Sequence, residues 1–146
     1  LSQLGSALAH VHSHRVLHRD IKPDNIFLSE APVTHRLGSA ARDVKLGDFG
    51  ISRVLSTQTK LAETVLGTPY YLSPELVWGQ PYDAASDVWA LGVVAFQLLT
   101  LRRPFEGPNL GALVMRIAKG QSDEPALSSC PHPAALRHLA SPQGLL

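Results

Sequence analysis

Apolar residues recur at helical spacing in three parts of the chain. Residues 1–11 carry leucines and a valine three or four positions apart, which predicts an amphipathic helix. Residues 87–99 are nearly apolar all round after the first position, which is typical of a helix buried at a core. A third stripe, residues 110–117, predicts a helix that Asn109 caps and Gly120 terminates.

Two compact runs bounded by turn-forming and polar residues, 26–28 and 44–46, predict short β-strands that pair as a hairpin. The segment between them, residues 29–43, is longer than the 2–5 residues usual in hairpin loops. It is interpreted as an exposed insertion or an artefact of gene prediction, and no chemistry is assigned to it. The predicted fold class is therefore α+β, mainly helical with one short hairpin.

Composition limits the possible partners. The 146 residues are 45% hydrophobic and 17% charged, which suits one globular core, and a net charge of +1 gives no case for nucleic acid. The longest apolar run, 88–96, is too short for a bilayer, which needs about 20 residues, so no membrane insertion is expected. The single cysteine, Cys130, excludes an internal disulfide and fits a reducing, cytoplasmic compartment.

Four histidines near the start raise the question of a metal site. His10 and His14 are four residues apart and could share a helix face, as zinc ligands do. No cysteine or carboxylate cluster completes such a site in the sequence. We therefore interpret His10, His12 and His14 as surface residues, and His18 as part of the motif that follows.

The stretch HRDIKPDN, residues 18–25, places an acid, a lysine and an amide in one short loop. Asp20 can accept a proton, Lys22 can neutralise phosphate oxygens, and Asn25 offers an oxygen of the hard type that Mg²⁺ prefers. Phosphoryl transfer requires these groups, because it is promoted mainly by positioning and charge stabilisation.

Three further motifs follow in order: DFG at 48–50, GTPYYLSPE at 67–75 and SDVWALG at 86–92. With the strings NIFL, KLGDFGISRVL and PFEGPNLGALVMRIAKG, they make the chain resemble the eukaryotic protein kinases, most closely the NIMA-related serine/threonine kinases. The resemblance implies a protein-kinase-like fold. It assigns residues 1–120 to the C-terminal lobe, from helix E to helix G, and leaves 121–146 as a degraded or divergent end.

The resemblance also implies the site and its cofactors, ATP and Mg²⁺. Asp20 would orient and deprotonate the acceptor hydroxyl, and Lys22 would contact the transferred phosphate. Asn25 and Asp48 would be the Mg²⁺ ligands, and Phe27 would lie against the adenine ring. In the resemblance, Lys22 of the HRDIKPDN loop and Thr68 of the GTP triplet are typical of serine/threonine kinases. Protein substrates with Ser or Thr acceptors are therefore expected.

Further residues take supporting roles in the resemblance. Thr64 is the expected activating phosphorylation site, with Thr59 as the alternative, and Arg19 and Arg53 would form its cationic pocket. Residues 69–71 would shape the loop that positions the substrate. The structural residues are His18, Phe49, Glu75 and Asp87.

Two of these structural residues carry specific expectations. Asp87, at the start of its predicted helix, is expected to accept hydrogen bonds from backbone donors and to hold the HRD loop. Glu75 is expected to be a buried charge without its partner, because the arginine that pairs with it in kinases is not recognisable. Breaking such a pair costs roughly 3–5 kcal/mol.

No glycine-rich loop, strand lysine or helix glutamate precedes Leu1. We therefore expect a piece of a longer protein that lacks the N-terminal lobe, that is inactive or nearly so alone, and that exposes apolar surface. The favoured function is a serine/threonine kinase, and the alternative is a non-catalytic protein-binding module. Localisation at the cytoskeleton, centrosome or cilium is suggested by the resemblance alone.

Overall fold

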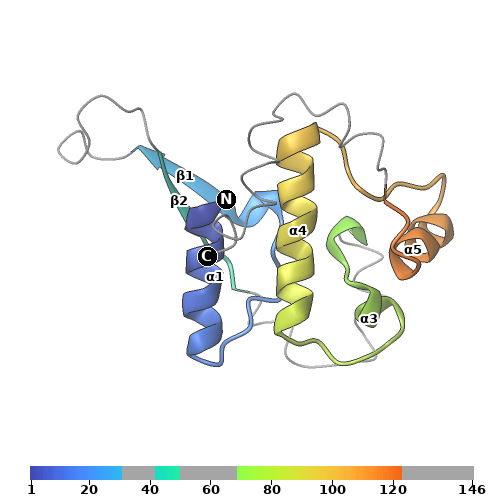
Figure 1. Ribbon diagram of the computed structural model, residues 1–146, viewed down its shortest axis with the longest axis horizontal. Helices are drawn as coiled ribbons and strands as arrows, with labels where there is room; N and C mark the ends of the chain where they lie inside the picture. Colours follow the sequence, from blue (N-terminus) through green and yellow to red (C-terminus); the bar gives the residue numbers. More distant parts are fainter. Residues whose placement is uncertain (31–41, 50–68, 123–146) are drawn as a thin grey trace.

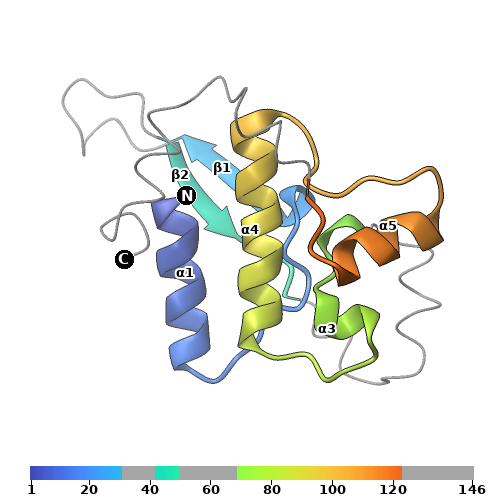
Figure 2. The same cartoon turned by 45° about the vertical axis from the view of Figure 1, so that its right-hand side comes forward.

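The computed structural model describes residues 1–30, 42–49 and 69–122. Helix α4 stands at the centre, with α1 and the β-hairpin on one side and α3 and α5 on the other (Figure 1). The same arrangement is visible after rotation by 45° (Figure 2). The helices and strands are α1 (Ser2–Ser13), η1 (Pro23–Asn25), β1 (Ile26–Glu30), β2 (Arg42–Leu46), η3 (Pro69–Tyr71), α3 (Pro74–Val77), α4 (Ala84–Thr100) and α5 (Leu110–Ala118).

The predicted first helix is confirmed as α1, and its apolar face reaches the core. Leu4 and Leu8 are both buried. Leu8 belongs to a cluster with Ile21 of the HRDIKPDN loop and with Ala90 and Val94 of α4. Because these side chains leave water together, the loop is held between two helices rather than lying free on the surface.

The predicted hairpin is confirmed and is longer than expected. β1 and β2 pair antiparallel, and the register runs from Ile26 opposite Leu46 to Glu30 opposite Arg42. Both strands thus extend into the segment 29–43 that was interpreted as an insertion, of which residues 31–41 lie outside the described part of the chain. The side-chain oxygen of Gln3 accepts a 2.7 Å hydrogen bond from the backbone of Val44, which joins α1 to the hairpin.

Helix α4 begins three residues earlier than predicted, at Ala84, because Asp83 caps it. The Asp83 carboxylate accepts hydrogen bonds from the backbone N–H groups of Ala85 and Ser86. In turn, the Ser86 hydroxyl oxygen accepts a hydrogen bond from the backbone N–H of Asp83, which completes a capping box. The prediction that this helix lies at a core is confirmed, because Ala90, Val93 and Val94 are buried in the core clusters. Its apolar residues are not all buried, however, since Val88 and Leu98 are exposed.

Helix α5 confirms the third apolar stripe. Asn109 caps it by accepting a 2.9 Å hydrogen bond from the backbone of Ala112. Leu113 and Ile117 are buried against Val93 of α4 and Phe105 of the connecting segment. This second cluster lies on the opposite side of α4 from the first, so α4 carries both halves of the core.

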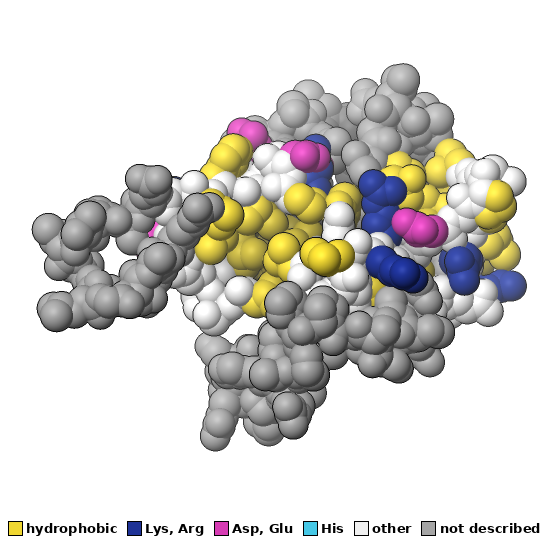
Figure 3. Space-filling model, turned by 90° about the horizontal axis from the view of Figure 1, so that it is seen from above, with side chains coloured by type: hydrophobic (Ala, Val, Ile, Leu, Met, Phe, Trp, Pro, Cys, Tyr) yellow, Lys and Arg dark blue, Asp and Glu magenta, His cyan; other side chains and the backbone are white. Residues whose placement is uncertain are grey.

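Large apolar side chains remain exposed on β1, among them Phe27 and Leu28. From above, hydrophobic side chains gather on one face over the hairpin and the end of α4 (Figure 3). The expected exposure of apolar surface is therefore observed. Within the described ranges, no helix is both long and apolar enough to cross a membrane.

Candidate active site

Two side chains of the loop between α1 and β1, those of Lys22 and Asn25, converge on the Asp20 carboxylate. The Asn25 amide nitrogen donates to the Asp20 carbonyl oxygen at 2.7 Å and to Asp20 Oδ2 at 2.9 Å. Lys22 Nζ forms an ion pair with the same Oδ2 at 2.9 Å. Pro23 begins the single turn η1 that brings Asn25 back towards Asp20. The local sequence thus fixes the orientation of the carboxylate.

The donor set of this loop fits Mg²⁺. Both side-chain hydrogen bonds of Asn25 use its amide nitrogen, so the side-chain oxygen Oδ1 is the end of the amide suited to a cation. The second candidate ligand, Asp48, is exposed and has a left-handed backbone with φ of 53°, a conformation that Asp tolerates better than most residues. A carboxylate and an amide oxygen are hard ligands of the kind Mg²⁺ prefers.

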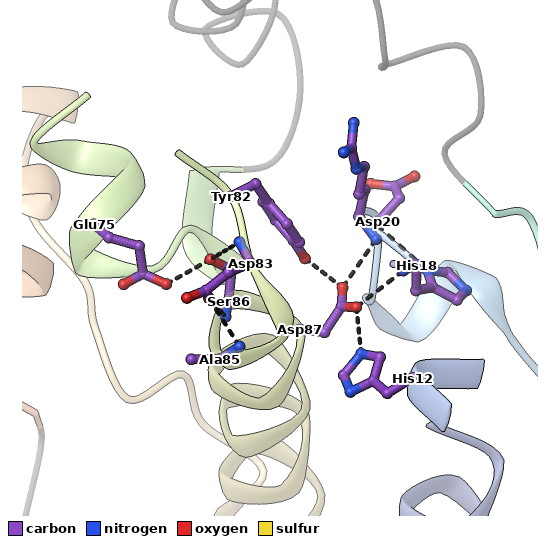
Figure 4. A network of polar contacts seen from close by, with 10 residues as sticks. His12, His18, Asp20, Glu75, Tyr82, Asp83, Ala85, Ser86 and Asp87 are labelled. Carbon is purple, nitrogen blue, oxygen red and sulfur yellow. Dashed lines mark hydrogen bonds and ion pairs between the residues drawn. The ribbon is translucent and has the colours of Figure 1, made fainter. Parts of the chain in front are cut away.

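Asp87 lies fully buried beneath this loop and accepts four hydrogen bonds (Figure 4). The backbone N–H groups of His18 and Arg19 donate at 2.9 Å each, to Oδ2 and Oδ1 respectively. His12 Nε2 donates to Oδ2 at 2.8 Å, and the Tyr82 hydroxyl donates to Oδ1. Asp87 therefore holds the HRD backbone, which is the contact that the resemblance implies, but Asp83 rather than Asp87 caps α4.

These donors keep the buried carboxylate ionised. Burial raises the pKa of Asp87, but the hydrogen bonds from Tyr82, His12 and the two backbone groups lower it by more, and the net pKa lies below its usual value. The pKa of Tyr82 is raised by burial and by the adjacent Asp87 carboxylate. Tyr82 consequently stays a neutral donor.

Two members of this network were not predicted. His12 was interpreted as a surface residue, yet its side chain is only partly exposed and contacts Asp87, 75 positions away. Tyr82 was assigned no role. Its position five residues before Asp87 could have indicated that its side chain reaches that carboxylate. By contrast, nothing in the sequence near His12 indicates that the end of α1 lies beside α4.

His18 connects the HRD motif to the DFG motif. The His18 ring is buried, and its Nε2 lies 3.0 Å from the carbonyl oxygen of Gly47. The centroids of the His18 and Phe49 rings are 4.6 Å apart. Nδ1 accepts from the backbone of Asp20 at 3.3 Å, which assigns the proton to Nε2. Burial lowers the pKa of His18, and this outweighs the Gly47 hydrogen bond and the nearby carboxylates of Asp87, Asp20 and Asp48, which raise it.

Phe27 lies on β1 next to the same Gly47. A Cβ atom at Gly47 would come within 2.9 Å of the Phe27 ring, so the glycine leaves room for this aromatic side chain. Phe27 is exposed, so its side chain is not part of the packed core.

The expectation that Glu75 is a buried charge without a partner is wrong. Glu75 is only partly buried in the first turn of α3 and accepts a hydrogen bond from the Ser86 hydroxyl of α4. Burial raises its pKa, but this hydrogen bond and its own backbone N–H lower it, and the net pKa is below its usual value. Among residues 1–30, 42–49 and 69–122, these hydrogen bonds stabilise the charge.

The remaining predicted residues are placed as follows. His10 and His14 are exposed with their rings 4.5 Å apart, and no group of three or more His, Cys, Asp or Glu side chains suited to a metal occurs among residues 1–30, 42–49 and 69–122. Several predictions lie outside the described residues: Arg53, Thr59, Thr64 and Thr68. The boundary at residue 120 stays a prediction.

Curated relatives and solved structures resemble this chain. It is 48% identical to serine/threonine-protein kinase Nek5 of Homo sapiens over 117 residues, which cover 80% of this chain and 15% of that protein. It is 49% identical to the probable serine/threonine-protein kinase nek3 of Dictyostelium discoideum over 120 residues, 82% of this chain and 10% of that protein. The chain thus spans a small part of the length of these relatives.

The fold is shared with crystal structures of Rad53. One, of Rad53 in complex with AMP-PNP, matches with a TM-score of 0.65 and 26% identity over 94% of this chain and 33% of that one. A second, of the kinase domain with AMPPNP, gives a TM-score of 0.64 at 24% identity over 97% of this chain and 49% of that one. Residues 1–134 match the protein kinase domain family, so the chain belongs to the protein kinases and is related to the Nek serine/threonine kinases.

Proposed function

We propose that the protein containing this chain transfers the γ-phosphate of ATP to serine or threonine hydroxyls of protein substrates. One observation carries the proposal: the Asp20 carboxylate is held by Lys22 at 2.9 Å and Asn25 at 2.9 Å within a single loop. A general base has to be oriented toward the hydroxyl it deprotonates, and this loop supplies that orientation.

Each residue has a defined part in this reaction. Asp20 accepts the proton of the acceptor hydroxyl as the hydroxyl oxygen attacks the γ-phosphorus of ATP. The bond from that phosphorus to the bridging oxygen breaks, and ADP leaves with that oxygen. Lys22, paired with Asp20, provides positive charge next to the transferred group, and Asn25 and Asp48 provide the Mg²⁺ ligands. Bound Mg²⁺ would neutralise the phosphate oxygens of ATP. The AMP-PNP in a related Rad53 crystal structure supports ATP as the nucleotide.

Serine and threonine are favoured as acceptors because Lys22 follows Asp20 by two positions, and the Nek relatives support this choice. Thr64 is proposed as the activating phosphorylation site. The phosphate would be bound by Arg19, whose backbone is fixed by Asp87, and by Arg53.

The proposal is tested on the complete protein by incubation with radiolabelled ATP, Mg²⁺ and dephosphorylated casein. We expect phosphoserine and phosphothreonine in the product, and we expect Asp20→Asn to lower transfer by at least about a hundredfold, because general-base catalysis typically contributes 10²–10⁴-fold. Asp24→Asn is the matched control. It makes the same chemical change at an exposed aspartate of the same loop and should leave the rate unchanged.

Two results would overturn the proposal. Radiolabel found only on phosphotyrosine would exclude serine and threonine as the acceptors. A parent protein that labels neither casein nor itself would favour the alternative, a kinase-like protein-binding module.

A further inference from the structure

The short helix η3, Pro69–Tyr71, is held between α4 and α5. Tyr70 and Tyr71 are half-buried and pack against the second core cluster, which includes Val93 and Phe105. This is the segment that the resemblance assigns to positioning of the substrate, and we call Pro69–Tyr71 the substrate segment.

Each tyrosine of the substrate segment has one polar contact with α4 or the residues that follow it. The Tyr71 hydroxyl donates to Gln97 Oε1 of α4 at 2.9 Å. The Arg103 guanidinium carbon lies 3.8 Å from the centroid of the Tyr70 ring. That separation is well within the limit of about 6 Å for a cation–π interaction.

The chain after α4 is folded so that Arg103 reaches this ring. Leu101 has a left-handed backbone with φ of 58°, which turns the chain away from the helix axis. Thr100 Oγ1 accepts a 3.2 Å hydrogen bond from the backbone of Arg102, and Pro104 and Phe105 are buried directly afterwards. The backbone is thus fixed on both sides of Arg103.

A plain interpretation of Arg103 is a solvated cation near the negative end of the α4 dipole. Its neighbour Arg102 fits that description, because it is exposed and its side chain forms no hydrogen bond or ion pair with other described residues. Arg103 differs, since it is half-buried over an aromatic face. Lys and Arg side chains are visible on this part of the surface, over α5 and the segment before it (Figure 3).

We propose that Arg103 is a positioning residue for the protein substrate. It stacks on Tyr70 and so fixes the substrate segment, whose shape decides how the acceptor protein approaches Asp20. The inference rests on the proposed kinase function and deepens it. It involves none of the proposed ATP or Mg²⁺ ligands, so its effect should be confined to the binding of protein substrate.

The test measures kcat, KM for dephosphorylated casein and KM for ATP in the complete protein. Arg103→Ala should raise KM for casein by about two- to fivefold, the effect of losing a partly exposed cation–π contact, and leave KM for ATP unchanged. The KM for casein of Arg103→Lys should lie between those of the parent and Arg103→Ala, because lysine keeps the charge without the planar stacking. Arg102→Ala removes the same charge one residue away and should behave as the parent.

A double-mutant cycle with Tyr70→Leu isolates the contact. Once the ring is absent, Arg103→Ala should have little further effect on KM for casein. Unchanged KM for casein in both Arg103 variants, or an equal increase in Arg102→Ala, would overturn the inference. Arg103→Lys keeps the test decisive if Arg103→Ala does not fold. An inactive parent would instead overturn the kinase function itself, so the two failures are distinguishable.

Discussion

Asp87 shows how a single buried charge is made compatible with a core. Removing a carboxylate from water is costly unless hydrogen bonds replace its hydration. Here the replacement comes from four donors, two of them backbone groups of the HRD loop and two the side chains of His12 and Tyr82. One residue thereby joins α1, α4 and the loop that carries Asp20.

Replacing Tyr82 tests the strength of this arrangement. Tyr82→Phe keeps the ring but leaves the buried Asp87 with one donor fewer. Because a hydrogen bond to a charged group is worth about 1.5–3 kcal/mol, we expect the free energy of unfolding to fall by that amount. Chemical denaturation monitored by tryptophan fluorescence measures the change.

Tyr71→Phe is the matched control for this prediction. It removes a hydroxyl that donates to the neutral Gln97 side chain, and such a bond contributes only about 0.5–1.5 kcal/mol. Equal losses in the two variants would mean that the charge of Asp87 adds nothing to the Tyr82 contact.

Residues of the candidate site differed in how far the sequence could predict them. Asp20, Lys22 and Asn25 lie within six positions, so chain geometry alone brings them together. Glu75 was wrongly expected to be unpaired, because its hydroxyl partner Ser86 was visible in the sequence but its position opposite α3 was not. The contact depends on how α3 and α4 pack, which no local pattern specifies.

At the scale of elements, the apolar period predicted which segments form helices and strands better than where they begin. α4 was placed too late because its first turn is polar, and the capping aspartate Asp83 precedes the apolar run. The four-residue helix α3 was not predicted, since it is too short to show a period. Capping and packing decide these boundaries.

Alanine substitutions at two glycines should change the free energy of unfolding in opposite directions. A Cβ at Gly107 would lie 2.6 Å from the backbone nitrogen of Leu113, so Gly107→Ala should force the segment before α5 away from the helix. We expect a loss of about 1–3 kcal/mol in the free energy of unfolding. Urea denaturation of the purified chain or of the complete protein measures it.

Gly5→Ala is the counterpart within α1. A Cβ there meets nothing within 4 Å, and alanine favours a helix over glycine by roughly 0.5–1 kcal/mol. Gly5→Ala should therefore stabilise the protein. Destabilisation by Gly5→Ala, or tolerance of Gly107→Ala, would contradict the packing described here.

For the molecule as a whole, the sequence predicted the protein-kinase fold because four motifs occur in a fixed order, and the family match supports it. The central position of α4 between two core clusters could not be predicted in the same way. Ala90 and Val94 turn toward one cluster and Val93 toward the other, and an almost uniformly apolar helix gives no signal of which face meets which neighbour.

The stability of the whole molecule should depend on pH through His18. Since burial lowers the pKa of His18 in the folded protein, the unfolded chain binds a proton there as the pH falls below about 6.5 while the folded chain does not. The free energy of unfolding should consequently be highest above that pH and decline toward pH 5, by at most about 1.4 kcal/mol per pH unit for one proton. Asp87 and Glu75, whose pKa values are also lowered, add losses only below about pH 4.

Urea midpoints measured between pH 7.5 and 5 distinguish His18 from the other histidines. His18→Gln removes the titrating ring and keeps a donor for the Gly47 carbonyl, so its stability should decline less steeply than that of the parent. His14→Gln, which makes the same replacement at an exposed position, is the control. If His18→Gln declined as steeply as the parent, the pH dependence would have to arise elsewhere, and the buried neutral imidazole that links the HRD and DFG motifs would not be its source.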